Sequence, residues 1–265
     1  FGGGTSTTSI INQHGGNVLI GVQNGSSTAN RNLYVDFQSA SGSATYNLSG
    51  GSLSVAGTIS ASYGSAYFNF TGGSLTAAAF NTANFANMPD GTLVNNGGTL
   101  APGGLGVAGT TAITGNYSNS VAGTLSFDLG GTTPANSFTN GAGDYDYVSV
   151  SGTVALGGTL GINLINGYTP APTSSFTVIS AGTGFTAGPE NFVNNYNGYV
   201  PVAGHPGVYM QAIIAGSSLV LTNYGVTPPA LAARFSPTNV YGVAPYTVTF
   251  ADTSSGAITN RHWVF

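Results

Sequence analysis

Few residues in this chain could do chemistry, and the closest pair of acids is Asp144 and Asp146. Glycoside hydrolysis uses two carboxyl groups, one as an acid and the other as a nucleophile or base. An i, i+2 spacing places both side chains on one face of a strand, where they could also bind Ca²⁺. We interpret them instead as solvent-facing residues of a turn and a strand start, and keep them as the metal candidates.

The other parts of a hydrolase or lyase site are missing. The chain has no Lys, and its three Arg residues lie far apart in sequence. The three His residues, His14, His205 and His262, show neither metal-ligand spacing nor a triad arrangement. The Gly-rich stretch "GGLGVAG" (103–109) is not followed by a helical pattern, so it does not indicate a dinucleotide site. We therefore expect no enzyme activity and no cofactor.

Composition narrows the possible partners. Only 4% of the 265 residues are charged, and the net charge is −4. So few cations make a nucleic-acid or anionic-membrane partner unexpected. No apolar run reaches the length of a transmembrane helix, and the absence of Cys excludes disulfides and thiolate zinc sites.

The elements that must carry these residues are strands. The 42 Gly residues, with many Ser, Thr and Asn, favour turns and strands, and no stretch has a 3.6-residue apolar period. Short alternating runs such as "TLSFDL" and "YVSVSGTVAL" predict strands with one buried face. The chain should be all-β.

A short phrase recurs along the chain. "YNLSGGSLSV" (46–55) is nearly repeated 22 residues later as "FNFTGGSLTA" (68–77). Gly-Gly-(Ser/Thr)-Leu returns at Gly97 and Gly157, with a variant at Ala122 and a degenerate first member near Gly15. The repeat residues are Gly50, Gly51, Leu53, Gly72, Gly73, Leu75, Gly97, Gly98, Leu100, Gly157, Gly158 and Leu160.

This period predicts a right-handed parallel β-helix, a β-solenoid in which each repeat is one coil. Leu53 should then stack on Leu75, and Leu75 on Leu100, in one inward row, with the paired glycines at corners. Tyr46, Phe68 and Phe70 occupy repeat positions and are interpreted as core. Irregular steps are expected if loops are inserted at one corner. An antiparallel sandwich or barrel with a chance repeat is the alternative.

Parts of the chain also resemble known families. "GGTLAPGG" (97–104), "GNYSNSVAGTLSFDLGG" (115–131) and "DYDYVSVSGTVALGGTLGINLINGYTP" (144–170) resemble the autotransporter-type β-strand repeats of bacterial surface proteins. That resemblance covers residues 46 to 224 and implies a secreted or surface-displayed right-handed β-helix. A translocator barrel is not part of the sequence, so self-transport is not implied.

Residues 233–265 are similar to the first half of a PKD domain, an Ig-like β-sandwich of extracellular proteins. The matching positions are Ala233, Phe235, Pro237, Gly242, Ala244, Pro245, Val248, Phe250, Asp252, Ser254, Gly256, Trp263 and Phe265. We thus expect a β-solenoid at 1–225, a linker at 226–232 and the N-terminal part of a PKD-like domain at 233–265. Half a sandwich cannot close its core, so another segment or molecule should complete it.

The sequence predicts a non-catalytic structural or adhesive protein, extracellular or on the cell surface. It is expected to associate with itself as a homopolymer or fibre, and possible further partners are glycans or cell-surface components. An unfinished piece of a longer monomeric adhesin is the alternative state. A carbohydrate-binding or polysaccharide-degrading β-helix is the alternative function, and an ice-binding solenoid is disfavoured by the irregular repeat steps.

Overall fold

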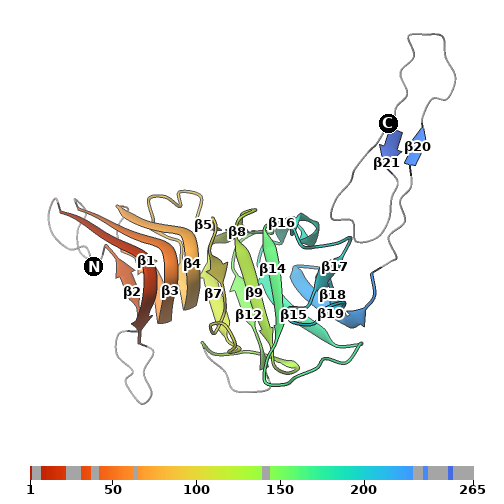
Figure 1. The fold of residues 1–265 in the computed structure, drawn as a ribbon. Helices are drawn as coiled ribbons and strands as arrows, with labels where there is room; N and C mark the ends of the chain where they lie inside the picture. Colours follow the sequence, from red (N-terminus) through yellow and green to blue (C-terminus); the bar gives the residue numbers. More distant parts are fainter. Residues whose placement is uncertain are drawn as a thin grey trace, which may run out of the picture.

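The computed structural model describes residues 1, 7–21, 31–36, 42–62, 65–138 and 144–228, and the backbone of 235–237 and 250–252. These residues are all-β, as the sequence predicts, with one short 3-10 turn, η1 (Pro189–Asn191) (Figure 1). The strands are β1 (Thr8–Ile20), β2 (Leu33–Val35), β3 (Ser43–Ala61), β4 (Ala66–Asn81), β5 (Thr92–Asn95), β6 (Thr99–Leu100), β7 (Thr110–Thr114), β8 (Asn116–Asn119), β9 (Thr124–Leu129), β10 (Thr133–Pro134), β11 (Asp144–Tyr145), β12 (Tyr147–Val150), β13 (Val154–Ala155), β14 (Thr159–Leu164), β15 (Ser175–Ala181), β16 (Phe185–Ala187), β17 (Tyr199–Pro201), β18 (Tyr209–Ala215), β19 (Ser218–Val226), β20 (Phe235–Pro237) and β21 (Phe250–Asp252).

Most strands pair in parallel, in three stacks. The asparagine stack contains the first arms of β1, β3 and β4, then β5, β8, β13 and β16. The leucine stack contains the second arms of the same three strands, then β6, β9 and β14. The third stack runs from β2 through the ends of β3 and β4 to β7, β12 and β15. The chain visits the stacks in this order and then begins again.

The leucine stack has the register that the repeat predicts. Leu53 pairs with Leu75, and Leu75 pairs with Leu100. All three side chains are buried. The same row continues through further in-register residues, and its members are Val18, Leu53, Leu75, Leu100, Leu125 and Leu160.

The paired glycines allow β3 and β4 to bend between their two arms. A Cβ on Gly72 would lie 2.3 Å from the carbonyl oxygen of Ser49, so a side chain cannot fit there. Gly73 has φ +68, a left-handed conformation that residues other than glycine adopt at a cost. Gly50 and Gly51 repeat this arrangement one sequence repeat earlier, in β3.

Aromatic side chains fill the core beside the asparagine stack. The rings of Tyr46 and Phe68 stack with centroids 5.7 Å apart, and Phe68 meets Phe80 edge-on at 5.1 Å. Tyr46, Phe68 and Phe70 are all buried, which confirms their interpretation as core residues.

Insertions between the strands explain the irregular repeat steps. The connections after β6, β9 and β14 lie between the leucine stack and the third stack. The connection between β4 and β5 lies at a different corner, between the third stack and the asparagine stack. The expectation that loops are inserted at one corner therefore holds only in part.

The strands after β16 run differently from the repeat. β19 pairs antiparallel with β15 and with β18, and β18 pairs antiparallel with β17. The two-residue connection between β18 and β19 explains why these two strands are antiparallel, because a parallel crossover needs a dozen or more residues. A continuous parallel repeat as far as residue 225 was expected, but the sheet is mixed at this end.

The segment that resembles a PKD domain is described only in part. β20 pairs antiparallel with β21, joining residues 235–237 to 250–252. The rest of 233–265 lies outside the described residues, so the Ig-like fold stays a prediction. In the described part of the chain, no helix is long and apolar enough to cross a membrane.

Candidate functional site

The two candidate metal ligands lie in different surroundings. Asp144 begins β11 and is half-buried, whereas Asp146 lies in the break between β11 and β12 and is 1% exposed. Asp146 Oδ1 accepts a hydrogen bond from the Gly109 amide (2.7 Å), and its Oδ2 accepts one from the Asp128 amide (2.8 Å). The interpretation of Asp146 as solvent-facing is therefore wrong, because backbone donors from two other segments hold it inside.

A second buried acid, Asp128 in β9, stands beside it and was not among the residues that the sequence indicated. Its Oδ2 accepts a hydrogen bond from the Gly106 amide, and its Oδ1 accepts one from Asn163 Nδ2 in β14 (2.9 Å). The Gly-rich stretch 103–109 thus folds its backbone N–H groups onto carboxylates of its own chain. No spacing signal pointed to Asp128, since the segments meet only in the folded chain.

The environment raises the pKa of both acids. Burial raises the pKa of Asp146 to about 9, and the nearby Asp128 carboxyl adds to the rise against the two backbone hydrogen bonds. Burial also raises the pKa of Asp128, against its bonds from Asn163 and the Gly-rich stretch. Solvent does not reach these two carboxyl groups. We therefore interpret them as internal contacts that hold the Gly-rich stretch against β9 and the start of β12, and not as an acid–base pair that acts on a substrate.

The remaining polar candidates are separate from this pair. His14 in β1 is exposed, with Nδ1 2.7 Å from Ser49 Oγ, and His205 lies in an exposed turn. His262, Arg234 and Arg261 lie outside the described residues. Within the described residues, no three His, Cys, Asp or Glu side chains gather as metal ligands.

A row of asparagine amides runs along the outer face of the asparagine stack. Asn47 Nδ2 donates to Asn12 Oδ1 (2.7 Å), Asn69 Nδ2 to Asn47 Oδ1 (2.7 Å), and Asn87 Nδ2 to Asn69 Oδ1 (3.1 Å). We call Asn12, Asn47, Asn69 and Asn87 the amide ladder. The aromatic-Asn-apolar phrase at 46–48 and 68–70 was the sequence signal for its middle members.

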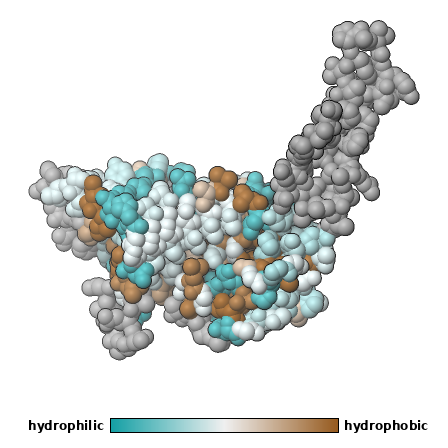
Figure 2. Space-filling model, in the orientation of Figure 1, coloured by the Kyte–Doolittle hydropathy of each residue, from teal (hydrophilic) through white to brown (hydrophobic). Residues whose placement is uncertain are grey.

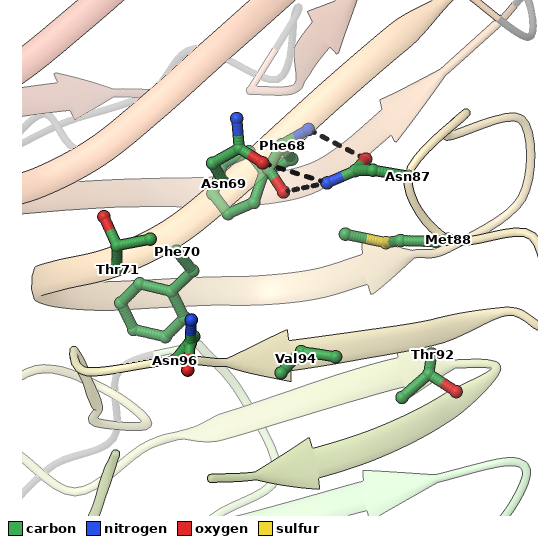
Figure 3. A pocket seen from close by; sticks show the side chains of 9 residues that line it. All are labelled: Phe68, Asn69, Phe70, Thr71, Asn87, Met88, Thr92, Val94 and Asn96. Carbon is green, nitrogen blue, oxygen red and sulfur yellow. Dashed lines mark hydrogen bonds between the residues drawn. The ribbon is translucent and has the colours of Figure 1, made fainter. Parts of the chain in front are cut away.

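A groove opens where the amide ladder reaches the insertion between β4 and β5. Asn87 bends back onto β4, where its amide accepts from the Phe68 N–H (3.3 Å) and donates to the Phe68 carbonyl (2.9 Å) (Figure 3). The groove has a volume of about 170 Å³, below the range of typical ligand pockets. Its lining residues are Phe68, Asn69, Phe70, Thr71, Asn87, Met88, Thr92, Val94 and Asn96.

The two ends of the stacks differ. Within the described residues, β1 pairs with β3 alone, so its other edge is open. At the far end, β19 covers β15, and the Asn194 amide binds both backbone groups of Leu160, at 3.0 and 2.8 Å. That amide takes the place of a neighbouring strand.

The surface over these elements is weakly polar. Figure 2 shows pale and teal surface over much of the described part, with brown apolar patches, some at the end that holds β1. Ile10 and Leu19 of β1 are 57% and 61% exposed. The features open to solvent are therefore the amide ladder, the groove and the β1 edge.

Comparison with known proteins identifies no relative of this chain. No family model, curated protein or solved structure matches the chain.

Proposed function

We propose that the chain is a non-catalytic structural or adhesive protein built as a right-handed parallel β-helix. The observation that carries this proposal is the pairing of strands in three parallel stacks around one buried core. Such a coil resists bending, because every coil is hydrogen-bonded to the next along the axis. Its polar, nearly uncharged faces suit contact with copies of itself or with neutral glycans.

The extracellular or cell-surface location belongs to the same proposal. It is supported by the resemblance to autotransporter-type repeats and to the PKD domain. Antibody labelling of intact source cells tests it. Labelling that needs permeabilised cells would contradict this location.

A direct test of the non-catalytic role is incubation with a panel of acidic and neutral polysaccharides. The chain should release neither reducing ends nor unsaturated products, because its paired acids, Asp128 and Asp146, are closed to solvent. Electron microscopy of the same preparation should show short rods. Release of sugar that stops on Asp146→Asn substitution would overturn the proposal.

Carbohydrate binding is a second candidate, and the groove is the observation that favours it. Tyr67 is 38% exposed. It lies two residues before Asn69 in β4, so both side chains are on the outer face of that strand. An exposed ring beside amide and hydroxyl groups can hold a sugar by stacking and hydrogen bonds.

A glycan array followed by calorimetry tests this second candidate. Binding should weaken at least about tenfold in Tyr67→Ala if the ring provides a stacking contact worth ~1.4 kcal/mol or more. The matched control is Tyr168→Ala, a tyrosine that packs near Phe176 away from the groove. Equal affinity in both variants would exclude a stacking contact with the Tyr67 ring beside the groove.

A further inference from the structure

The groove lies where two strands of the asparagine stack separate. β4 and β5 pair through Phe70 and Asn95, and the Asn96 N–H donates to the Phe70 carbonyl (2.8 Å). The next pair in register would be Phe68 with Leu93, and the two strands do not form it. Figure 3 shows Phe70 beside Asn96, whereas the strands separate towards Phe68. The groove is thus a gap in a parallel ladder.

The missing pair leaves two backbone groups of β5 facing the groove. The Ser120 N–H donates to the Asn95 carbonyl (3.0 Å), so the odd-numbered residues of β5 face β8. Because strand residues alternate in direction, the Thr92 carbonyl and the Val94 N–H face β4 instead. Within the described residues, neither of these two groups has a hydrogen-bond partner from β4. They are therefore open to a ligand.

The other side of the gap is already filled. The Phe68 N–H and C=O, which the missing pair would use, bond to the Asn87 amide at 3.3 and 2.9 Å. That amide can replace a strand because it carries a donor and an acceptor side by side. A ligand on the β5 side needs the same two functions, a donor for the Thr92 carbonyl and an acceptor for the Val94 N–H.

Two hydroxyls on adjacent ring carbons of a sugar supply this pair, since each hydroxyl can donate or accept. The secondary amide of an acetylated amino sugar does not, because the N–H and C=O of a trans amide point in opposite directions. A primary amide would also fit, but only a sugar adds a ring face for the exposed Tyr67. Asp90, whose Oδ1 accepts from the Thr92 N–H (3.2 Å), disfavours anionic sugars here.

We propose that the groove binds the vicinal diol of a neutral sugar residue. One hydroxyl donates to the Thr92 carbonyl, and its neighbour accepts from the Val94 N–H. This inference rests on carbohydrate binding by the groove and names the substrate class. The volume of about 170 Å³ suits contact with the edge of one sugar residue. Sugars whose adjacent hydroxyls are blocked or cleaved are not bound.

A proline tests the backbone donor, because it removes the N–H at one residue. Val94 is 44% exposed, and its N–H is not used by the β4–β5 ladder, so Val94→Pro is a tolerated place for proline in a strand. Binding of mannan, a neutral polysaccharide with free vicinal diols, should weaken about tenfold in calorimetry. Val94→Ala is the matched control, since it shortens the side chain and keeps the N–H. Circular dichroism verifies the fold of both variants.

The ligand can be changed instead of the protein. Periodate breaks the carbon–carbon bond between two hydroxyl-bearing carbons and leaves two aldehydes, while periodate itself is reduced to iodate. Mannan treated in this way should lose its binding to the unmodified chain. Oxidised mannan that binds as well as intact mannan would contradict recognition of a diol.

Hydrogen exchange of the unmodified chain gives a reading that does not depend on a variant. Mannan should slow exchange at the Val94 amide and leave the Leu93 amide, which faces β8, unchanged. Bound mannan without this slowing overturns the diol contact, and so does a folded Val94→Pro chain that binds as Val94→Ala does. Slowing by glutamine, a primary amide, and not by mannan overturns it as well. In each of these cases carbohydrate binding by the groove still stands, because it fails only if the glycan array shows no bound sugar.

Discussion

At the scale of single residues, the buried pair Asp128 and Asp146 is the least expected part of the molecule. Two carboxyl groups are enclosed where water cannot solvate them, so their protonated forms are favoured. Backbone N–H groups of Gly106 and Gly109 still bind them. The pair therefore joins the Gly-rich stretch to β9 and to the start of β12.

These acids should make stability depend on pH. The pKa of Asp146 is about 9 in the folded chain against an ordinary value of 3.8, so the folded chain binds more protons between these values. Stability should therefore fall as the pH rises from about 4 to about 9. Melting temperatures measured across this range test the prediction.

The matched variants for that measurement are Asp146→Asn and Asp90→Asn. The first removes the ionisable group from the buried pair, so the fall in melting temperature should become shallower. Asp90→Asn changes an exposed carboxylate whose Oδ1 accepts a hydrogen bond from the Thr92 amide. In this variant the melting temperature should still fall with rising pH as it does in the unmodified chain. A wild-type melting temperature that rises with pH over this range would contradict the assignment.

The leucine row gives a second prediction at this scale. Leu75 is 1% exposed and lies between Leu53 and Leu100 in the leucine stack. Leu75→Ala should lower the free energy of unfolding by about 2–5 kcal/mol, because a cavity remains in a close-packed core. Leu105→Ala is the control, since Leu105 is 64% exposed and its truncation should change stability by less than about 0.5 kcal/mol. Equal losses of unfolding free energy in the two variants, measured by urea denaturation, would contradict the predicted role of the leucine row.

At the scale of elements, asparagine amides substitute for missing strands. Asn87 binds both backbone groups of Phe68, and Asn194 binds both backbone groups of Leu160. A primary amide can do this because it carries a donor and an acceptor side by side, as a peptide group does. At these two places the amides thus supply the hydrogen bonds that a neighbouring strand would give to Phe68 and Leu160.

Removing one of these amides should therefore cost stability. Asn194→Ala leaves the N–H and C=O of Leu160 without partners, which should cost about 1–3 kcal/mol. Asn191→Ala is the control, because that exposed amide bonds only within its own turn. Hydrogen exchange at the Leu160 amide should become faster in Asn194→Ala and should not change in Asn191→Ala. Unchanged protection of this amide in Asn194→Ala would show that Leu160 does not need the Asn194 side chain as a hydrogen-bond partner.

At the scale of the whole molecule, the low charge sets how the protein responds to salt. With three cationic and seven acidic residues, few ion pairs can form and little repulsion needs screening. The melting temperature should shift by less than roughly 3 °C between low salt and half-molar sodium chloride, since surface ion pairs contribute little here. A large fall on adding salt would reveal an electrostatic network that the composition does not suggest.

The sequence by itself determined the all-β class, the register of the leucine row and the buried aromatic positions. It could do so because a repeat of about 22 residues places like residues on like, and alternation along a strand separates the buried face from the exposed face. Both signals are local, so they can be read along the chain.

Only the tertiary structure decided where the parallel order stops and which acids meet. Asp128 and Asp146 come together because the Gly-rich stretch folds over β9, and spacing within one strand could pair only Asp144 with Asp146. β18 and β19 are antiparallel because a two-residue turn joins them, and β19 also pairs antiparallel with β15, the last strand of the third stack. Contacts between distant segments are set by which edges and cavities the packed strands leave open, and no local pattern records them.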